Sequence, residues 1–151
     1  MKMTYKSFIK GALVVLVALT MSGCFVNLIT QEYKDSLLED EKQWYVYKFT
    51  LKDGQEFEPI WKEAQSTMSF DTEENRIFGV SVCNNYFATF ALRGKKLKVS
   101  ASGASRRLCH PSESSRYEFW FVRSLEGEFV IEKEGKEMRL KGEHATYYLR
   151  R

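Results

Sequence analysis

Histidine and cysteine are scarce in this sequence. The 151 residues include two histidines and three cysteines, with neither a Cys-x-x-Cys pair nor a phosphate-binding glycine loop. Four side chains could in principle form a zinc site: Cys83, Cys109, His110 and His144. Their spacing matches no common zinc site, and adjacency of a cysteine and a histidine is no evidence of a facing nucleophile–base pair. We therefore expect no catalytic residue, no metal and no cofactor, and a protein that is not an enzyme.

A long apolar run is also missing. The run from Gly11 to Leu19 is short, because a membrane-spanning helix needs about 20 apolar residues. Lys2, Lys6 and Lys10 precede it with no acidic residue among them. A basic start, a short apolar run and small residues before a cleavage point describe a secretory signal peptide. An ordinary N-terminal membrane helix that happens to contain a cysteine is the alternative.

The cleavage point resembles that of a bacterial lipoprotein signal. Ser22 and Gly23 are the small residues that such signals place before the cysteine, whereas Met21 stands where leucine is usual. The resemblance implies that residues 1–23 are removed and that Cys24 is acylated. Stable anchoring takes more than one acyl chain. The next residue is not the aspartate that favours retention in the inner membrane, so the resemblance implies the outer membrane, with the domain facing the periplasm.

The positive charge belongs to the signal. The chain has 23 basic and 20 acidic residues, and the first 23 residues hold three lysines and no acid. Without them, 20 basic residues face 20 acidic ones. Nucleic-acid binding therefore loses its electrostatic support, and we expect no nucleic-acid partner.

Two cysteines, Cys83 and Cys109, remain after acylation of Cys24. Disulfides persist in an oxidising compartment, and an even number of cysteines there favours a Cys83–Cys109 bridge. Two buried free thiols are the alternative, because free cysteine packs like a small apolar residue. Closing this loop would stabilise the fold by about 3–4 kcal/mol in the chain-entropy model.

Residues 24–43 are expected to form the lipid anchor and a tether with a helical tendency. We interpret the tether as a solvated stalk. A short amphipathic helix on the bilayer is the alternative, although the acidic run Glu39-Asp40-Glu41 would be repelled by anionic lipid.

Short aromatic and β-branched segments separated by turn residues predict strands through a single domain over residues 44–151. The predicted strands are 44–51, 66–70, 76–83, 86–92, 97–100, 128–133, 137–141 and 145–150. Gly79 is expected to allow a close backbone approach or a bulge. Residues 57–62 are predicted to form a loop or one helical turn, and residues 101–109 a loop. Many short strands with few helices indicate a mainly β fold, an antiparallel β-barrel or sandwich with one packed α-helix.

Residues 111–127 are the helix candidate. Ser112 or Ser114 could cap it, and Gly127 would end it. A stripe at helical spacing would face the sheet: Tyr117, Trp120, Phe121, Ser124 and Leu125. Alternating aromatic residues in the same segment leave a strand as the alternative.

The chain resembles the META domain, or HslJ-like, family from about Trp44 to Leu149. The residues that carry the resemblance are Trp44, Phe70-Asp71 to Gly79, Cys83-Asn84, Tyr86 or Phe87, Ser105-Arg106, Cys109, Glu118, Phe121 and Leu125. The family usually has glycine before the first cysteine, where this chain has Val82. The resemblance implies a barrel-like fold with a packed helix, no agreed active site, and roles around envelope stress and resistance.

Asn84 and Arg106 are the candidate polar site. Asparagine tolerates left-handed backbone geometry and bonds nearby backbone groups, and arginine offers a fixed fork of donors. We expect the two side chains to join neighbouring loops beside the bridge. The functional alternative is a site in which Arg106 binds a carboxylate or phosphate.

These observations predict a membrane-anchored envelope lipoprotein with a non-catalytic domain. It would act as an interaction, assembly or stress module with an envelope protein partner. The alternative is a carrier or sensor of a lipid or another small apolar ligand held inside the barrel, which the aromatic richness of the chain would suit.

Overall fold

A computed structural model describes residues 26–39, 42–60 and 65–151 of the chain. The predicted signal peptide and Cys24 therefore lie outside the described residues. Within the described residues, no helix is both long and apolar enough to cross a membrane.

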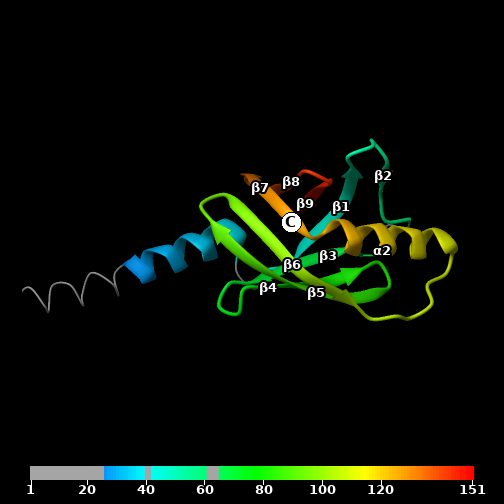
Figure 1. Cartoon of the computed structure of the whole chain (residues 1–151), viewed down its shortest axis with the longest axis horizontal. Coiled ribbons are helices and arrows are strands. Elements are labelled where there is room, and N and C mark those ends of the chain that lie inside the picture. The colour runs from blue at the N-terminus through cyan, green and yellow to red at the C-terminus, as the bar shows by residue number, and fades with distance from the viewer. Residues whose placement is uncertain (1–25, 40–41, 61–64) are drawn as a thin grey trace, which may run out of the picture.

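Eight antiparallel strands close into a barrel, because the first strand pairs with both the second strand of the barrel and the last (Figure 1). The barrel strands are β1 (Trp44–Leu51), β3 (Thr67–Asp71), β4 (Arg76–Ser81), β5 (Asn84–Arg93), β6 (Lys96–Ala104), β7 (Gly127–Glu134), β8 (Glu137–Gly142) and β9 (Ala145–Arg150). A two-residue strand, β2 (Glu56–Phe57), adds to β1. The predicted mainly β barrel is confirmed.

Side chains alternate between the inside and the outside of the barrel, as the pleat of a strand requires. In β5, Asn84, Tyr86, Ala88 and Phe90 are buried and the residues between them are exposed. Gly79 in β4 permits a close approach to β3, because an added Cβ would lie 2.1 Å from the carbonyl oxygen of Thr67. The sequence-based expectation for Gly79 is thus confirmed as a close approach.

Aromatic rings fill the interior of the barrel. The ring of Phe49 has four aromatic neighbours with centroids 4.8 to 5.7 Å away: Phe57, Tyr117, Phe121 and Tyr147. Phe49, Phe121 and Tyr147 are fully shielded from solvent. Such packing contributes to stability both through buried apolar area and through favourable ring geometry.

The predicted helix is present as α2 (Ser112–Ser124), which closes one end of the barrel. Its contact with the barrel strands is polar as well as apolar, since the hydroxyl of Tyr147 in β9 donates to the carbonyl oxygen of Phe121 at 2.7 Å.

The caps predicted for this helix are wrong. Pro111 occupies the N-cap position without a side-chain hydrogen bond, and the helix ends at Leu125, before Gly127. Proline has a fixed φ and so can begin a helix without a capping side chain.

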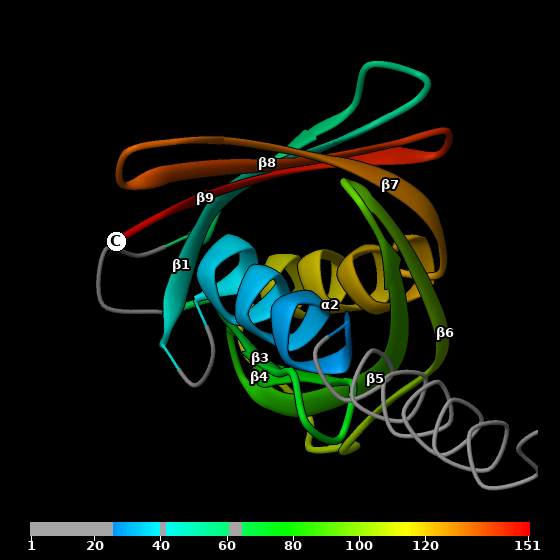
Figure 2. The same ribbon diagram turned by 90° about the vertical axis from the view of Figure 1, so that its left-hand side faces the viewer.

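A second helix, residues 26–38, closes the other end of the barrel, so the expected single helix is an undercount. Figure 2, which looks along the barrel from this end, shows the helix in front of α2, and Figure 1 shows its N-terminal part extending away from the barrel. Leu38 is fully buried, and its carbonyl oxygen accepts a hydrogen bond from the indole of Trp44 at 3.1 Å. A stalk solvated throughout therefore does not describe the end of this segment.

Strand β6 is longer than predicted and takes in residues that were expected to be loop. Ala101 has a φ of 51°, and the register against β5 shifts between Phe87 and Thr89. A bulge of this kind lets a strand continue past residues of low strand propensity. The extension carries the chain directly to the disulfide.

Candidate functional site

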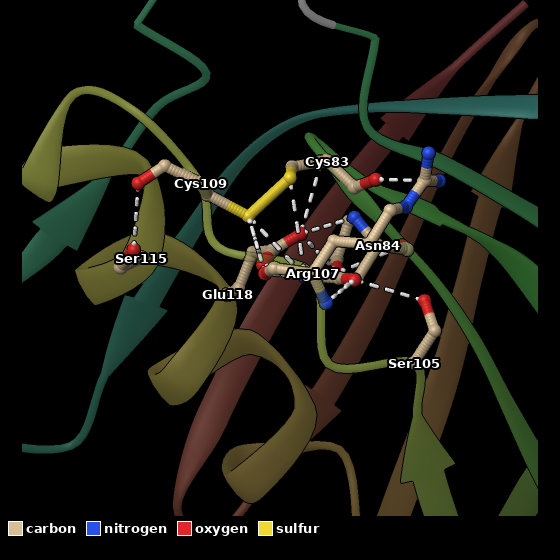
Figure 3. The surroundings of a disulfide bond; sticks show 8 residues. Cys83, Asn84, Ser105, Arg107, Cys109, Ser115 and Glu118 are labelled. Carbon is tan, nitrogen blue, oxygen red and sulfur yellow. Dashed lines mark hydrogen bonds between the residues drawn. A yellow bond between two sulfur atoms is a disulfide. The ribbon is translucent and has the colours of Figure 1, made fainter.

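The two predicted cysteines meet at the α2 end of the barrel (Figure 3). Cys83 lies in the two-residue turn between β4 and β5, and Cys109 lies just before α2. They form the Cys83–Cys109 disulfide, with their Cα atoms 6.1 Å apart. The bridge therefore ties a tight hairpin turn to the segment that leads into the helix.

Glu118 on α2 is the centre of this corner. Its Oε1 accepts hydrogen bonds from the backbone N–H of Cys83 at 2.9 Å and from the backbone N–H of Asn84. Its Oε2 accepts a hydrogen bond from the side-chain amide of Asn84 at 2.7 Å, and the hydroxyl of Ser81 lies 3.3 Å from Oε1. The carboxylate is buried, and no ion pair to it occurs among the described residues.

Hydrogen bonding makes a buried carboxylate tolerable here. An ionised carboxylate loses several kcal/mol on leaving water unless donors replace the water. Each hydrogen bond to a charged group returns roughly 1.5–3 kcal/mol. Two backbone and two side-chain donors surround Glu118, so the carboxylate holds the β4–β5 turn together with the backbone hydrogen bond from Cys83 to Ser81.

Asn84 joins the turn to the loop between β6 and α2. Its Oδ1 accepts hydrogen bonds from the hydroxyl of Ser105 at 2.9 Å and from the backbone N–H of Arg107 at 2.8 Å. Its amide also donates to the carbonyl oxygen of Arg107 at 3.1 Å. The guanidinium of Arg107 donates to the carbonyl oxygen of Cys83 at 3.2 Å.

The structure places Arg106 differently from the expectation. Arg106 is exposed, and no hydrogen bond or ion pair of its side chain occurs among the described residues. The loops are joined instead by Asn84, Ser105 and Arg107. Neighbouring arginines point in different directions along an irregular loop, so the sequence did not distinguish them.

Val82 has an unusual backbone conformation in the same turn, with a φ of 74°. Glycine adopts this region freely, whereas a β-branched residue rarely does, at a cost of about 1–2 kcal/mol. The position is the one where the resemblance to the META domain family predicts glycine. Packing of Val82 against the core offsets part of this strain.

The corner offers sulfur and oxygen but no ready metal site. The two sulfurs and the Glu118 carboxylate lie within 4.8 Å of one another. Zinc binds cysteine as thiolate, and here both sulfurs are engaged in the disulfide. The 2.9 Å approach of the Cys109 sulfur to Oε2 of Glu118 is an S···O contact, because a disulfide sulfur carries no proton.

Hollows formed by the described residues lie on the surface rather than in the middle of the barrel. One of them, of about 500 Å³, lies at the C-terminal half of α2 and is lined by Leu51, Lys52, Asp53, Trp120, Arg123, Ser124, Glu126 and His144. Glu126 already accepts hydrogen bonds from the backbone and hydroxyl of Ser102, which hold the pKa of its carboxyl below its usual range. The imidazole-bearing residues His110 and His144 are both exposed.

The family follows from a match that covers the barrel, both cysteines and α2. A model of the META domain matches residues 35–151. The chain belongs to the META domain family. The match begins before β1, within the helix that packs on the barrel, so the META domain of this chain includes part of the segment expected to be tether.

Two solved structures share the fold of this META domain. One, titled as the NMR structure of a protein from Burkholderia xenovorans, has a TM-score of 0.62 at 20% identity, covering 79% of this chain and 87% of that one. The other NMR structure has a TM-score of 0.57 at 14% identity, covering 77% and 92%. No curated protein matches the sequence. Similarity at these identities shows the fold alone.

Sequence reasoning did not assign a role to Glu118, although a signal was present. Glu118 lies four residues after Ser114, three before Phe121 and seven before Leu125, which is the spacing of one helix face. All of these residues are buried. An acidic residue on the apolar face of a helix predicts a buried carboxylate that needs donors, but the helix alone does not say which loop supplies them.

Proposed function

We propose that this protein is an envelope lipoprotein, acylated at Cys24, whose META domain binds another envelope protein without catalysing a reaction. The domain would be held at the outer membrane and face the periplasm. The observation that carries the proposal is the Cys83–Cys109 disulfide downstream of a sequence that resembles a lipoprotein signal. Such a bridge suits the oxidising compartment to which the signal would deliver the chain.

The fixed geometry of the META domain supports a binding role. Its interior is filled with rings, and both ends are closed by helices. The polar atoms at the disulfide corner hydrogen-bond to one another. A protein of this kind can recognise a partner through its outer surface.

The outer face of β4 and β5 carries a candidate contact surface. Phe78 and Phe87 are directly opposite each other in the sheet, and their side chains are 39% and 54% exposed. The end of the Phe87 ring lies over Gly103 in β6, where an added Cβ would be 2.9 Å from Cζ of the ring. Exposed aromatic pairs on a rigid strand are typical of interaction surfaces.

A lipid carrier is less well supported. A ligand held inside the barrel needs a cavity, and the barrel axis is occupied by Phe49, Phe121 and Tyr147. The described hollows lie at the surface and are lined largely by charged residues. The aromatic richness that suggested an apolar ligand is used for the core.

Acylation is tested by growing cells with an alkyne fatty acid. We expect label in the wild-type chain and none in Cys24→Ala. Intact mass of the mature chain without reductant should be lower by two hydrogens than after reduction. Label that survives in Cys24→Ala would contradict the anchor, and a full thiol count would contradict the disulfide.

The binding role is tested by placing a photo-crosslinking amino acid at Phe87 in cells. We expect one reproducible envelope protein to be captured from the acylated chain. The matched control is Val130, which is 45% exposed on the outer face of β7. Equal capture from both positions, or capture that persists when Cys24 is replaced by alanine, would contradict a specific contact through β4 and β5.

A further inference from the structure

The helix of residues 26–38 presents two different faces. Gln31, Lys34, Asp35 and Leu38 recur at intervals of three and four residues and face the barrel. The amide of Gln31 donates to the hydroxyl of Thr72 at 2.9 Å, and the ammonium of Lys34 donates to the side-chain oxygen of Asn75 at 2.8 Å. This face is therefore held against the β3–β4 turn.

The other face is apolar and exposed. Val26, Ile29 and Tyr33 share one side of the helix and are 58%, 51% and 44% exposed. Three exposed apolar side chains along one face of a helix are unusual unless that face contacts another protein or a membrane. Val26 is the second residue after Cys24, so acyl chains on that cysteine would hold these side chains beside the lipid surface.

A basic turn lies at the same end of the barrel. The β5–β6 hairpin carries Arg93, Lys95 and Lys96, all exposed, and none makes an ion pair among the described residues. Figures 1 and 2 both show the tip of this hairpin projecting toward the end from which the helix emerges. The β3–β4 turn, which carries Glu73 and Glu74, lies against the opposite, docked face of the helix.

We propose that Val26, Ile29 and Tyr33 insert into the surface of an anionic lipid bilayer, with the β5–β6 hairpin facing the head groups. This inference rests on the proposed acylation of Cys24. Amphipathic helices bury their apolar face at the boundary of head groups and acyl chains, and nearby lysine and arginine side chains are attracted to anionic lipid. Because hydrogen bonds hold the helix against the β3–β4 turn, insertion of its apolar face would fix the orientation of the META domain on the membrane.

The test uses the mature acylated protein, which begins at Cys24, in vesicles of phosphatidylcholine and phosphatidylglycerol, with or without bromine on the lipid acyl chains. Tryptophan is introduced by Ile29→Trp or, as a matched control, Leu28→Trp. Leu28 is 69% exposed but lies off the apolar face. Emission is taken as the difference from wild type, which has three tryptophans.

Bromine should quench the Ile29→Trp signal about twofold and leave the Leu28→Trp signal nearly unchanged, given the shallow depth of such helices. Adding Lys95→Glu and Lys96→Glu should reduce the quenching on vesicles with phosphatidylglycerol but not on phosphatidylcholine alone. If these charge changes have no effect, the hairpin does not face the head groups.

Mass spectrometry of the Cys24 peptide separates the two proposals. An acylated protein in which both tryptophans are quenched equally, or neither is, overturns the membrane-facing helix and leaves the anchor standing. A chain without acyl groups overturns the anchor and this inference with it.

Discussion

At the α2 end of the barrel the chain is held by a disulfide and a buried carboxylate, whereas at the end closed by residues 26–38 it is held by the buried Leu38 and by polar contacts closer to solvent. Glu118 is buried and accepts hydrogen bonds from a tight turn. At the other end, Glu39 forms ion pairs with Lys133 at 2.7 Å and with Arg151. Both ends of the barrel are closed by a helix, but a disulfide and buried hydrogen bonds hold one helix, whereas partly exposed ion pairs help to hold the other.

The difference predicts how each end responds to its surroundings. Salt screens exposed ion pairs but has little effect on buried hydrogen bonds. Burial would raise the pKa of Glu39, but the hydrogen bond and charge of Lys133, with Arg151 and Lys42, hold it below its usual value. The end closed by residues 26–38 should therefore loosen with acid and salt before the α2 end does.

The largest effect is expected for Glu118→Ala, which tests whether the buried carboxylate holds the α2 end. The change removes the carboxylate that accepts from the backbone N–H groups of Cys83 and Asn84 and from the Asn84 amide. The N–H of Cys83 keeps the carbonyl oxygen of Ser81, and the Asn84 amide keeps that of Arg107. A hydrogen bond to a charged group contributes roughly 1.5–3 kcal/mol, and the second acceptors recover part of the loss, so we expect a destabilisation of about 3–5 kcal/mol. Urea unfolding measures it. Glu113→Gln, on the exposed side of the same helix, should change stability by less than about 0.5 kcal/mol, and equal losses would refute the assignment.

Leu38→Ala tests whether the helix of residues 26–38 belongs to the folded unit. Leu38 is fully buried, and truncating a buried leucine costs about 3 kcal/mol through lost burial and a cavity. The control is Leu28→Ala at an exposed position of the same helix. Thermal unfolding of both variants measures the difference. If the two variants unfold at the same temperature, the segment is a solvated stalk and does not belong to the folded unit.

Glu39→Gln should cost about 1 kcal/mol near neutral pH, since it removes a partly exposed ion-pair network. A carboxyl whose folded pKa is lowered adds stability above its unfolded pKa, and this is lost as pH falls through the folded pKa. The difference between wild type and Glu39→Gln should therefore vanish as pH falls below the ordinary value of 4.5. Unfolding free energies across this range, at low and high salt, would show it. A difference that grows with acid would reverse the sign and rule out the network.

The smallest net effect is expected for Val82→Gly. Glycine relieves the positive φ of 74° but loses partly buried packing and makes the unfolded chain more flexible. The matched variant Val80→Gly loses a similar half-buried side chain without relieving a positive φ. We expect Val82→Gly to be less destabilising by about 1–2 kcal/mol. Equal losses in urea unfolding would mean that the turn carries no strain.

The strands and α2 were predictable because their signals are local. Apolar residues alternate from Tyr86 to Leu92, which predicts a strand. The stripe through Tyr117 and Phe121 recurs every three to four residues, which predicts a helix. The pairing of Cys83 with Cys109 followed from counting cysteines. The ends of the elements were less predictable, since the bulge at Ala101 depends on the neighbouring strand.

The polar contacts of the site were not predictable in the same way. Arg106 and Arg107 have the same chemistry, and only the path of the loop makes Arg107 the contact to Cys83. The burial of Leu38 depends on Trp44 and the barrel end, which lie beyond the helix itself. The sequence pattern of residues 26–38 does not by itself predict which face of this helix packs against the barrel.

The sequence by itself determined that this chain folds into a mainly β domain with a helix within residues 111–127, because hydrophobic period and turn chemistry act over a few neighbouring residues. The tertiary structure decided that Glu118 holds the disulfide corner and that a second helix closes the barrel. Those outcomes depend on donors and apolar surface that distant segments bring together only after the barrel has closed.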